Sequence, residues 1–282
     1  MNNAKKLIIF TDMDGTLLDH HTYSHAAADS LLASLNQQSI PVIPTTSKTF
    51  AELIPLRASI NNQHAFIVEN GAAIYLPKAQ FTHPEPDWLE VGDFWLKYFV
   101  SERAHWRQLL ATLPESMQSQ YTSFTELGVA GIAQLTGLTP QQAKLSADRQ
   151  FGEPVHWQGS GEALNDFCQA VADAGGKTLV GGRFVHISGD VDKGKAVVWL
   201  IDAYQRQFNA KLVSLGLGDS GNDVAMLARV DYPIIVRSPV HEPPLVERSE
   251  PNAHPLLVTQ AAGPEGWVEG VTQVIKLIEG DL

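Results

Sequence analysis

Short apolar runs alternate along the chain with longer segments whose apolar residues recur at helical spacing. The short runs are typical of buried strands, and the longer segments are typical of amphipathic helices. We predict strands at 7–10, 40–44, 65–68, 213–218 and 232–236, and helices at 24–38, 50–60, 193–204, 224–229 and 268–278. Strands that alternate with helices predict a Rossmann-like α/β core with a parallel sheet. Asn70-Gly71 between two apolar runs predicts a hairpin.

The alternation stops in the middle of the chain. Pro84 and Pro86 precede the change, and neither a helix nor a central strand tolerates proline well. We expect helices at 94–113, 127–137, 140–146 and 161–174, a strand at 155–157, and a hairpin of 178–180 and 183–187 around Gly181-Gly182. This mixture predicts a small α+β domain, residues 84–189, inserted into a discontinuous core of residues 1–83 and 190–282.

The composition narrows the classes of partner. The chain has 282 residues and a formal net charge of −11, without a long basic run. Binding to a nucleic-acid backbone needs clustered Lys and Arg, so we expect no nucleic-acid partner. The single cysteine, Cys168, excludes an internal disulfide and fits a reducing compartment. The apolar runs fall far short of the ~20 residues of a membrane-spanning helix. We therefore expect a cytoplasmic protein that does not enter a membrane.

Acidic residues follow the first predicted strand. Asp12 and Asp14 come directly after the run at 7–10, and Gly15 allows the backbone to turn sharply. In an open α/β sheet, sites form at the carboxyl ends of strands. Two carboxylates placed there repel each other unless a bound cation or a shared proton compensates. For this short motif alone, an Asp-rich turn with an Asx-type hydrogen bond is an alternative.

Polar turns also follow later strands. Thr46 lies in a hydroxyl-rich turn before a predicted helix, where free backbone N–H groups favour an anion, although an ordinary helix cap would use the same residues. Lys193 begins another helix, where a cation gains nothing from the helix dipole unless an anion binds nearby. Asp219 and Asp223 flank the turn after a later strand. In a chain that already has a carboxylate pair after its first strand, a bare turn explains these residues poorly.

Two of these turns resemble motifs of the haloacid dehalogenase (HAD) superfamily of phosphotransferases. They are Asp12-Met13-Asp14-Gly15-Thr16-Leu17-Leu18, which resembles the nucleophile motif, and Gly218-Asp219-Ser220-Gly221-Asn222-Asp223, which resembles the fourth motif. Thr46 and Lys193 stand where the second and third motifs are expected. All four motifs occur in the superfamily's order, and the predicted insertion lies where the larger type of HAD cap domain is found.

This resemblance implies a Mg²⁺-dependent phosphomonoester hydrolase that acts through an aspartyl-phosphate. Asp12 would be the nucleophile, and Asp14 would be the general acid and base. Thr46 and Lys193 would hold the phosphoryl oxygens. The implied metal ligands are Asp12, Asp14 through its carbonyl, Asp219 and Asp223, the last as a direct or an indirect ligand.

Further segments resemble the mannosyl-3-phosphoglycerate phosphatases, a family within this superfamily. They lie at 46–49, 68–71, 152–154, 182–186 and 263–267. The resemblance covers nearly the whole chain and implies that mannosyl-3-phosphoglycerate is converted to mannosylglycerate, a compatible solute. One departure is Thr45-Thr46, where a Ser-rich pair is expected, but the hydroxyl is retained. The candidate substrate-binding residues are Ser47, Lys48, Glu69, Asn70, Arg183, His186 and Asn222.

Arg183 is the candidate for binding the glycerate carboxylate or the sugar, because a planar guanidinium can bind a carboxylate through two hydrogen bonds. The alternative is an exposed strand arginine. On a regular strand, Arg183 and His186 point to opposite faces, so only one of them should face the site unless a bulge intervenes.

Two other functions remain open. One is a broader sugar-phosphate phosphatase or a phosphomutase on the same scaffold. The other is a non-catalytic binding or regulatory module that keeps the fold, and the intact Asp12, Asp14, Lys193 and Asp219 argue against it. The sequence does not indicate which sugar is bound or an oligomeric state.

Overall fold

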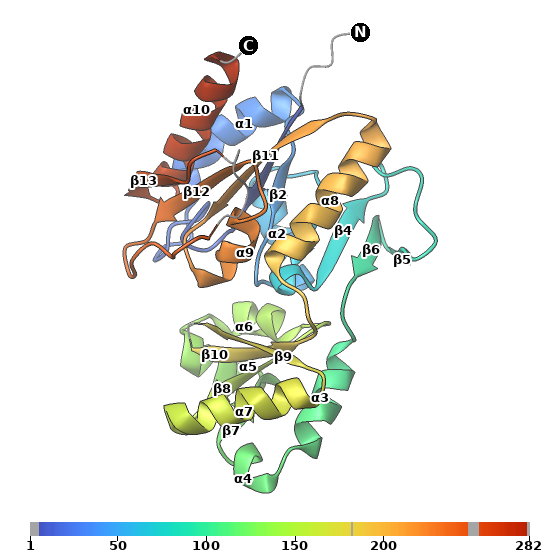
Figure 1. Ribbon diagram of the computed structural model, residues 1–282, viewed down its shortest axis with the longest axis vertical. Coiled ribbons are helices and arrows are strands. Elements are labelled where there is room, and N and C mark those ends of the chain that lie inside the picture. Colours follow the sequence, from blue (N-terminus) through green and yellow to red (C-terminus); the bar gives the residue numbers. More distant parts are fainter. Residues whose placement is uncertain (1–5, 182, 248–253, 281–282) are drawn as a thin grey trace. The chain divides into compact units, whose positions relative to one another are not determined.

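The computed structural model describes residues 6–181, 183–247 and 254–280, and the chain divides into two compact units (Figure 1). The first unit holds the chain up to Thr46, Arg57–Lys97 and the chain from Asp192 onward, and the second holds Ser47–Leu56 and Tyr98–Val191. Gly182, which we predicted in a hairpin turn, lies outside the described residues. Across the described ranges, every helix is too short or too polar to cross a membrane.

A five-stranded parallel sheet forms the centre of the first unit. Its order is β13-β12-β11-β1-β2, and every neighbouring pair is parallel, which confirms the predicted α/β class. The strands are β1 (Lys6–Thr11), β2 (Val42–Pro44), β11 (Leu212–Gly218), β12 (Tyr232–Arg237) and β13 (Leu257–Ala262). Ile8, Ile9 and Phe10 of β1 are fully buried, as expected for a strand that is covered on both faces.

Strand β13 lies at one edge of this sheet and is missing from our prediction, which ended with the strand at 232–236. Polar Thr259 and Gln260 interrupt its apolar pattern. The Thr259 hydroxyl is nevertheless buried, where it accepts the Arg237 N–H at 3.0 Å and donates to the Ala261 carbonyl at 2.7 Å. These hydrogen bonds offset the cost of burying a polar group, and the hydrophobic pattern does not register them.

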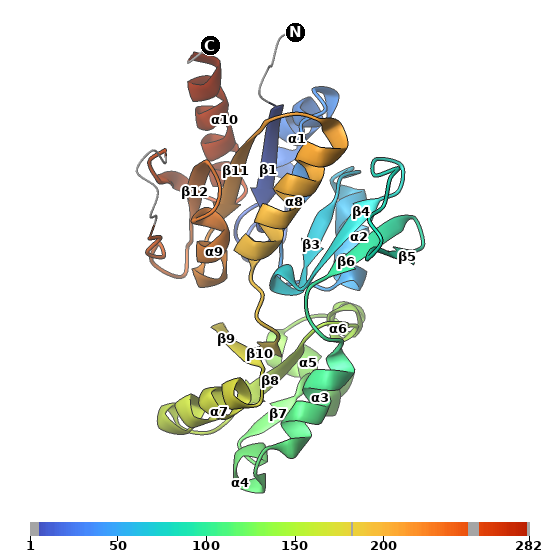
Figure 2. The same ribbon diagram turned by 45° about the vertical axis from the view of Figure 1, so that its right-hand side comes forward.

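Helices cover both faces of the parallel sheet, with α1 and α10 on one face and α8 and α9 on the other (Figure 2). The helices of this unit are η1 (Ala26–Ala28), α1 (Asp29–Gln37), α8 (Lys193–Phe208), η3 (Gly221–Asp223), α9 (Val224–Leu227) and α10 (Glu265–Gly280). A further helix, α2 (Phe50–Ser59), contributes residues to both units.

A second sheet in this unit has the order β3-β4-β6-β5. Its strands are β3 (Phe66–Val68), β4 (Ala73–Pro77), β5 (Leu89–Val91) and β6 (Phe94–Tyr98). The turn η2 (Glu69–Gly71) joins β3 to β4, which confirms the predicted hairpin. The helix predicted at 94–113 is wrong in its first part, because Phe94 packs edge-on against Phe66 and Tyr75 of this sheet and residues 94–98 form β6.

The second unit is built on an antiparallel sheet of order β7-β8-β10-β9. Its strands are β7 (Tyr121–Ser123), β8 (Glu153–Trp157), β9 (Lys177–Gly181) and β10 (Phe184–Ser188), and its helices are α3 (Arg103–Thr112), α4 (Glu115–Gln118), α5 (Phe124–Thr136), α6 (Pro140–Ala147) and α7 (Gly161–Asp173). On β10, Phe184 packs against the core of α5 and α6, whereas Val185 and Ile187 are buried toward the other face. This unit therefore has its own α+β core.

Trp267 of α10 anchors that helix to the parallel sheet, because its fully buried indole donates to the Thr11 hydroxyl at 3.1 Å. Trp267→Ala removes this bond and leaves a large cavity, so it should lower the free energy of unfolding by about 3–5 kcal/mol in a urea titration. Leu277→Ala on the same helix, where the side chain is 51% exposed, should change it by less than about 0.5 kcal/mol. Equal losses in the two variants would contradict the role of Trp267 in the core.

Candidate active site

Polar side chains gather at the carboxyl edge of the parallel sheet. Asp12 directly follows β1, and Asp219 directly follows β11. The two strands end level with each other, because the Asp12 N–H donates to the Leu217 carbonyl at 2.8 Å. After β2, the Thr45 N–H donates to the last carbonyl of β1, which brings Thr46 to the same edge. The parallel sheet therefore brings together three of the four predicted motifs.

The remaining motif, the third in the order given by the sequence, enters through Lys193, the first residue of α8. Asp192 caps this helix by accepting the Lys195 N–H at 2.8 Å. The Nζ of Lys193 lies 2.5 Å from Asp12 Oδ1 and 2.6 Å from Asp223 Oδ1, and its side chain is fully buried. Burial disfavours the charged amine, but the two carboxylates outweigh this effect and raise the pKa of Lys193 above its usual value. Lys193 is therefore a buried positive charge.

Asp12, Asp219 and Asp223 form a buried carboxylate cluster, in which one oxygen from each residue lies within 4.8 Å of the others. Burial raises the pKa of Asp12 well above its usual value, although Lys193 opposes this shift. Burial, together with the neighbouring Asp223, raises the pKa of Asp219 to about 6. When all three carboxylates are ionised, Lys193 leaves two negative charges uncompensated. The carboxylate oxygen atoms are hard ligands, and together with this excess negative charge they suit a divalent metal ion.

Asp223 also shapes the turn that carries Asp219. Its Oδ2 accepts the backbone N–H groups of Asp219 and Ser220, both at 3.1 Å. Its Oδ1 accepts a hydrogen bond from Lys193. Both oxygens of this carboxylate are thus engaged by donors of the chain, and they connect the start of α8 to the turn after β11.

The turn after Asp12 packs closely against Asp219. Gly15 has φ = +78°, and a Cβ at this position would lie 2.7 Å from Asp219 Oδ2. Only glycine combines this backbone conformation with such a close approach. The buried hydroxyl of Thr16 lies 3.5 Å from Asp219 Oδ1. Asp14 belongs to the same turn and is half-buried, and its assignment as acid and base stays a prediction.

Three of the predicted substrate residues lie in the first unit, beside Thr46. The Thr46 carbonyl accepts the Asn70 N–H at 2.9 Å, and the Asn222 amide donates to Asn70 Oδ1 at 3.2 Å. The third, Glu69, is 5% exposed. The structure thus brings these residues together with the second and fourth motifs, whereas their contact with a substrate stays a prediction.

The other predicted substrate residues belong to the second unit. They are Ser47, Lys48, Arg183 and His186. The Ser47 carbonyl accepts a hydrogen bond from Arg149 Nη2 at 3.1 Å. Burial, with a smaller contribution from Arg149, lowers the pKa of His186 to about 3, so its imidazole is neutral near pH 7.

Arg183 is placed differently from our expectation. It is exposed and lies in the turn before β10, not on the strand. Its guanidinium donates to the Leu135 carbonyl near the end of α5. The strand therefore begins one residue later than predicted, at Phe184, so the argument from alternation along a regular strand does not apply to Arg183. Which of Arg183 and His186 contacts a substrate stays a prediction.

The sequence analysis missed His241, which lies in the irregular segment after β12. Its Nε2 is 3.4 Å from Asp219 Oδ2. Residues 238–247 form neither helix nor strand, so no periodic pattern marks this histidine. Its position beside the carboxylate cluster follows only from the folded chain.

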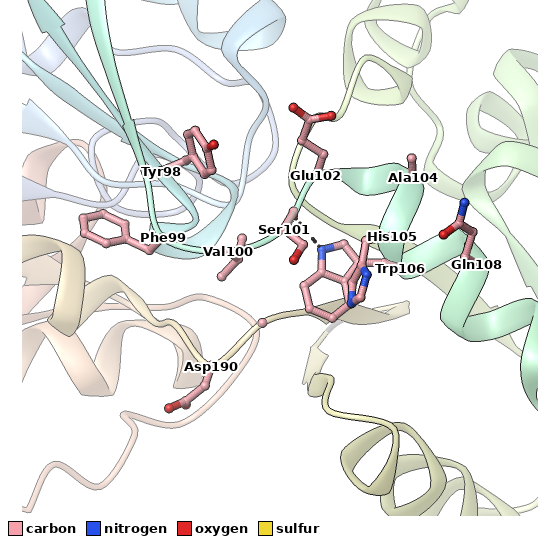
Figure 3. A pocket seen from close by; sticks show the side chains of 11 residues that line it. Tyr98, Phe99, Val100, Ser101, Glu102, Ala104, His105, Trp106, Gln108 and Asp190 are labelled. Carbon is pink, nitrogen blue, oxygen red and sulfur yellow. Dashed lines mark hydrogen bonds between the residues drawn. The ribbon is translucent and has the colours of Figure 1, made fainter. Parts of the chain in front are cut away.

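A surface groove of about 790 Å³ lies in the second unit (Figure 3). It is lined by residues 98–102, the first turns of α3, and Gly189 and Asp190. The Trp106 indole in its wall donates to the Ser101 carbonyl at 2.9 Å. The groove carries the carboxylates of Glu102 and Asp190, and none of its lining residues is Lys or Arg. It therefore does not suit a phosphate ester.

Sequence comparisons connect this chain to a known family. A family model described as haloacid dehalogenase-like hydrolase matches residues 9–86. A glucosyl-3-phosphoglycerate/mannosyl-3-phosphoglycerate phosphatase from Methanococcoides burtonii is 36% identical over 272 residues, which cover 96% of this chain and 97% of that protein.

Solved structures resemble the fold over nearly its whole length. A protein from Bacteroides thetaiotaomicron, described among the phosphatases of the HAD superfamily, has a TM-score of 0.65 at 14% identity and covers 98% of this chain and 96% of its own. A sucrose-phosphatase from Synechocystis, in complex with sucrose and phosphate, has a TM-score of 0.54 at 14% identity and covers 98% of both chains. At these identities the likeness shows the fold alone.

Asp219→Asn should stabilise the protein when divalent metal ions are removed with EDTA. The pKa of Asp219 in the folded protein, about 6, lies above the value of about 3.9 in an unfolded chain. The carboxyl group is therefore neutral in both states only well below pH 4, and it increasingly destabilises the fold as the pH rises from about 4 to about 6. We expect a gain of about 2–3 kcal/mol at pH 8 and about 0.5 kcal/mol or less at pH 4, measured by urea unfolding at each pH.

Asp166→Asn provides the control, because Asp166 is exposed on α7. It should change stability little at either pH. A gain for Asp219→Asn that stays constant between pH 4 and pH 8 would rule out the buried carboxylate as its cause.

Proposed function

Because the chain belongs to the haloacid dehalogenase-like hydrolases, we propose that it is a metal-dependent phosphatase of glycosyl-3-phosphoglycerates. The favoured reaction converts mannosyl-3-phosphoglycerate to mannosylglycerate and phosphate, and glucosyl-3-phosphoglycerate is the alternative substrate. The name of the relative from Methanococcoides burtonii supports both. The observation that carries the proposal is the buried Lys193, held between Asp12 and Asp223 beside Asp219.

In the first step, Asp12 is the nucleophile. A carboxylate oxygen of Asp12 forms a bond to phosphorus while the ester P–O bond breaks, which gives an aspartyl-phosphate and an alkoxide. Asp14 donates a proton to that alkoxide, so the glycosylglycerate leaves with a protonated hydroxyl group. The positive charge of Lys193 favours the ionised form of Asp12 and opposes the effect of burial.

In the second step, the intermediate is hydrolysed. Asp14, now deprotonated, takes a proton from a water molecule whose oxygen attacks phosphorus. The bond between phosphorus and Asp12 breaks, and its electron pair restores the Asp12 carboxylate as phosphate leaves. The proton that Asp14 lost in the first step is thus recovered in the second.

The candidate metal ligands are Asp12, Asp219 and the Asp14 carbonyl, and we propose Mg²⁺ because it prefers hard oxygen ligands. The ion, when bound, supplies positive charge that offsets the repulsion between these carboxylates and a phosphate group. Asp223 holds Lys193 and the turn of Asp219 in place through its two oxygens. Lys193 and Thr46 stabilise the phosphoryl oxygens through charge and hydrogen bonding.

The second unit is our candidate for recognition of the leaving group. The carboxylate cluster, Lys193 and Thr46 contact only the phosphate in this scheme, so they treat one phosphomonoester like another. A site that binds the sugar and the carboxylate can reject analogues that lack them by orders of magnitude. Ser47, Lys48, Arg183 and His186 are the candidates in this unit. We assign the enzyme to the cytoplasm, in keeping with its single cysteine.

Asp12→Asn should abolish phosphate release from glycosyl-3-phosphoglycerates, because an amide does not form the acyl-phosphate. The measurement is colorimetric phosphate release with Mg²⁺, over a panel that includes other sugar phosphates and so detects a broader phosphatase. Asp29→Asn, at an exposed position of α1, should keep wild-type turnover. Turnover near the wild-type rate by the purified Asp12→Asn variant would refute this mechanism.

Arg183→Ala should lower kcat/KM strongly for the glycosyl-3-phosphoglycerate and much less for p-nitrophenyl phosphate, which has neither sugar nor carboxylate. The comparison cancels general damage to the carboxylate cluster. Equal losses on both substrates would assign Arg183 to the structure of the second unit, through its bond to the Leu135 carbonyl. If kcat/KM were unchanged on both substrates, Arg183 would not be a substrate-binding residue.

A further inference from the structure

Three consecutive residues of the turn η2 adopt left-handed backbone conformations. The φ values are +49° at Glu69, +59° at Asn70 and +98° at Gly71. Asparagine tolerates this region better than most residues, whereas glutamate rarely adopts it. A run of such residues persists only where the surrounding structure enforces it, and it is a reason to look for a function.

The surroundings of this turn are segments of the candidate site. The Asn70 N–H donates to the carbonyl of Thr46, at 2.9 Å. A Cβ on Gly71 would lie 2.3 Å from the carbonyl oxygen of Asp192 and 3.1 Å from the backbone nitrogen of Lys193. The turn therefore touches both the phosphate-binding threonine of the proposed mechanism and the residue pair that begins α8.

The side chain of Asn70 makes a third connection. Its Oδ1 accepts the Asn222 amide at 3.2 Å, and Asn222 Oδ1 in turn accepts the Ser220 hydroxyl at 2.6 Å. Both amide oxygens are thus engaged within the protein. Asn222 is adjacent to Asp223, whose carboxylate binds Lys193. One turn consequently joins the second, third and fourth motifs.

We propose that Asn70 is a positioning residue that fixes Thr46, the start of α8 and the turn of Asn222 relative to one another, and that it does not contact the glycosylglycerate. The inference rests on the proposed phosphatase function, and it replaces substrate binding as the role of Asn70. We call the contacts of Asn70 with these three segments the Asn70 clamp. Displacement of a reacting group by about 1 Å can cost on the order of 100-fold in rate, so loss of the Asn70 clamp should slow catalysis.

The kinetic test uses Asn70→Ala, Asn70→Gly and Asn70→Asp. Asn70→Ala loses both the amide and a residue suited to the left-handed turn, and Asn70→Gly keeps the backbone freedom but loses the amide. Both should lower kcat by about tenfold or more, equally on a glycosyl-3-phosphoglycerate and on p-nitrophenyl phosphate, with little change in KM. Asn70→Asp keeps an acceptor oxygen for Asn222 and should therefore retain most of the wild-type activity.

Asn61→Ala is the matched control, because Asn61 also has a positive φ, +50°, and is exposed. It carries a similar backbone penalty and should leave kcat unchanged. A rise in KM for the glycosyl-3-phosphoglycerate alone, without loss on p-nitrophenyl phosphate, would overturn the proposal and make Asn70 a substrate contact. If Asn61→Ala lost as much activity as Asn70→Ala, backbone strain alone would explain the loss of activity, and the proposal would be overturned.

A second measurement does not depend on turnover. Because Asn70 and Asn222 share one hydrogen bond, the stability losses of Asn70→Ala and Asn222→Ala should be non-additive, with the double variant losing less than the sum of the two. Additive losses in thermal unfolding would overturn the clamp even if the enzyme is active. If the wild-type protein released phosphate from none of the esters tested, the proposed function would be refuted. The comparison of the single and double variants in thermal unfolding would still decide whether the Asn70 clamp exists.

Discussion

A buried lysine held between two carboxylates is the interaction on which the candidate site depends. Lys193 comes from the start of α8, Asp12 from the end of β1 and Asp223 from the turn after β11. Removing one partner from such a buried network leaves an uncompensated charge, which typically costs about 3–5 kcal/mol. The same charges that would bind a phosphate and a cation therefore also join three segments that are far apart in sequence.

Among the described residues, the three carboxylates of the cluster outnumber the single ammonium group of Lys193 that contacts Asp12 and Asp223. Burial raises the pKa of Asp12 and Asp219, and Lys193 opposes this only in part. In water these carboxylates would separate, but Gly15 and the capped turn at Asp223 hold them at the sheet edge. Such a cluster costs free energy unless a bound cation or a shared proton compensates its excess charge, so binding of a cation there would stabilise the fold.

The second unit is stabilised by separate interactions. Glu153 is fully buried at the start of β8, where it accepts hydrogen bonds from the Arg103 guanidinium and the Thr125 N–H, so one carboxylate joins α3, α5 and the sheet. Phe184 packs into the core of α5 and α6. Because this core is independent of the carboxylate cluster, its surface residues can change without disturbing the groups proposed to act on phosphate.

The sequence by itself determined the α/β class, the strand-then-turn positions of Asp12, Thr46 and Asp219, and the start of α8 at Lys193, because these depend on local hydrophobic period and on turn residues. Only the tertiary structure decided the rest. Strand β13 was missed because polar Thr259 interrupts its apolar pattern, although hydrogen bonds satisfy the buried Thr259 hydroxyl. Residues 94–98 form a strand and not a helix because Phe94 packs against Phe66 and Tyr75 of the same sheet. The contact of His241 with Asp219 and the three-way connection of Asn70 join residues far apart along the chain. No local pattern encodes such contacts, because they depend on the packing of the whole unit.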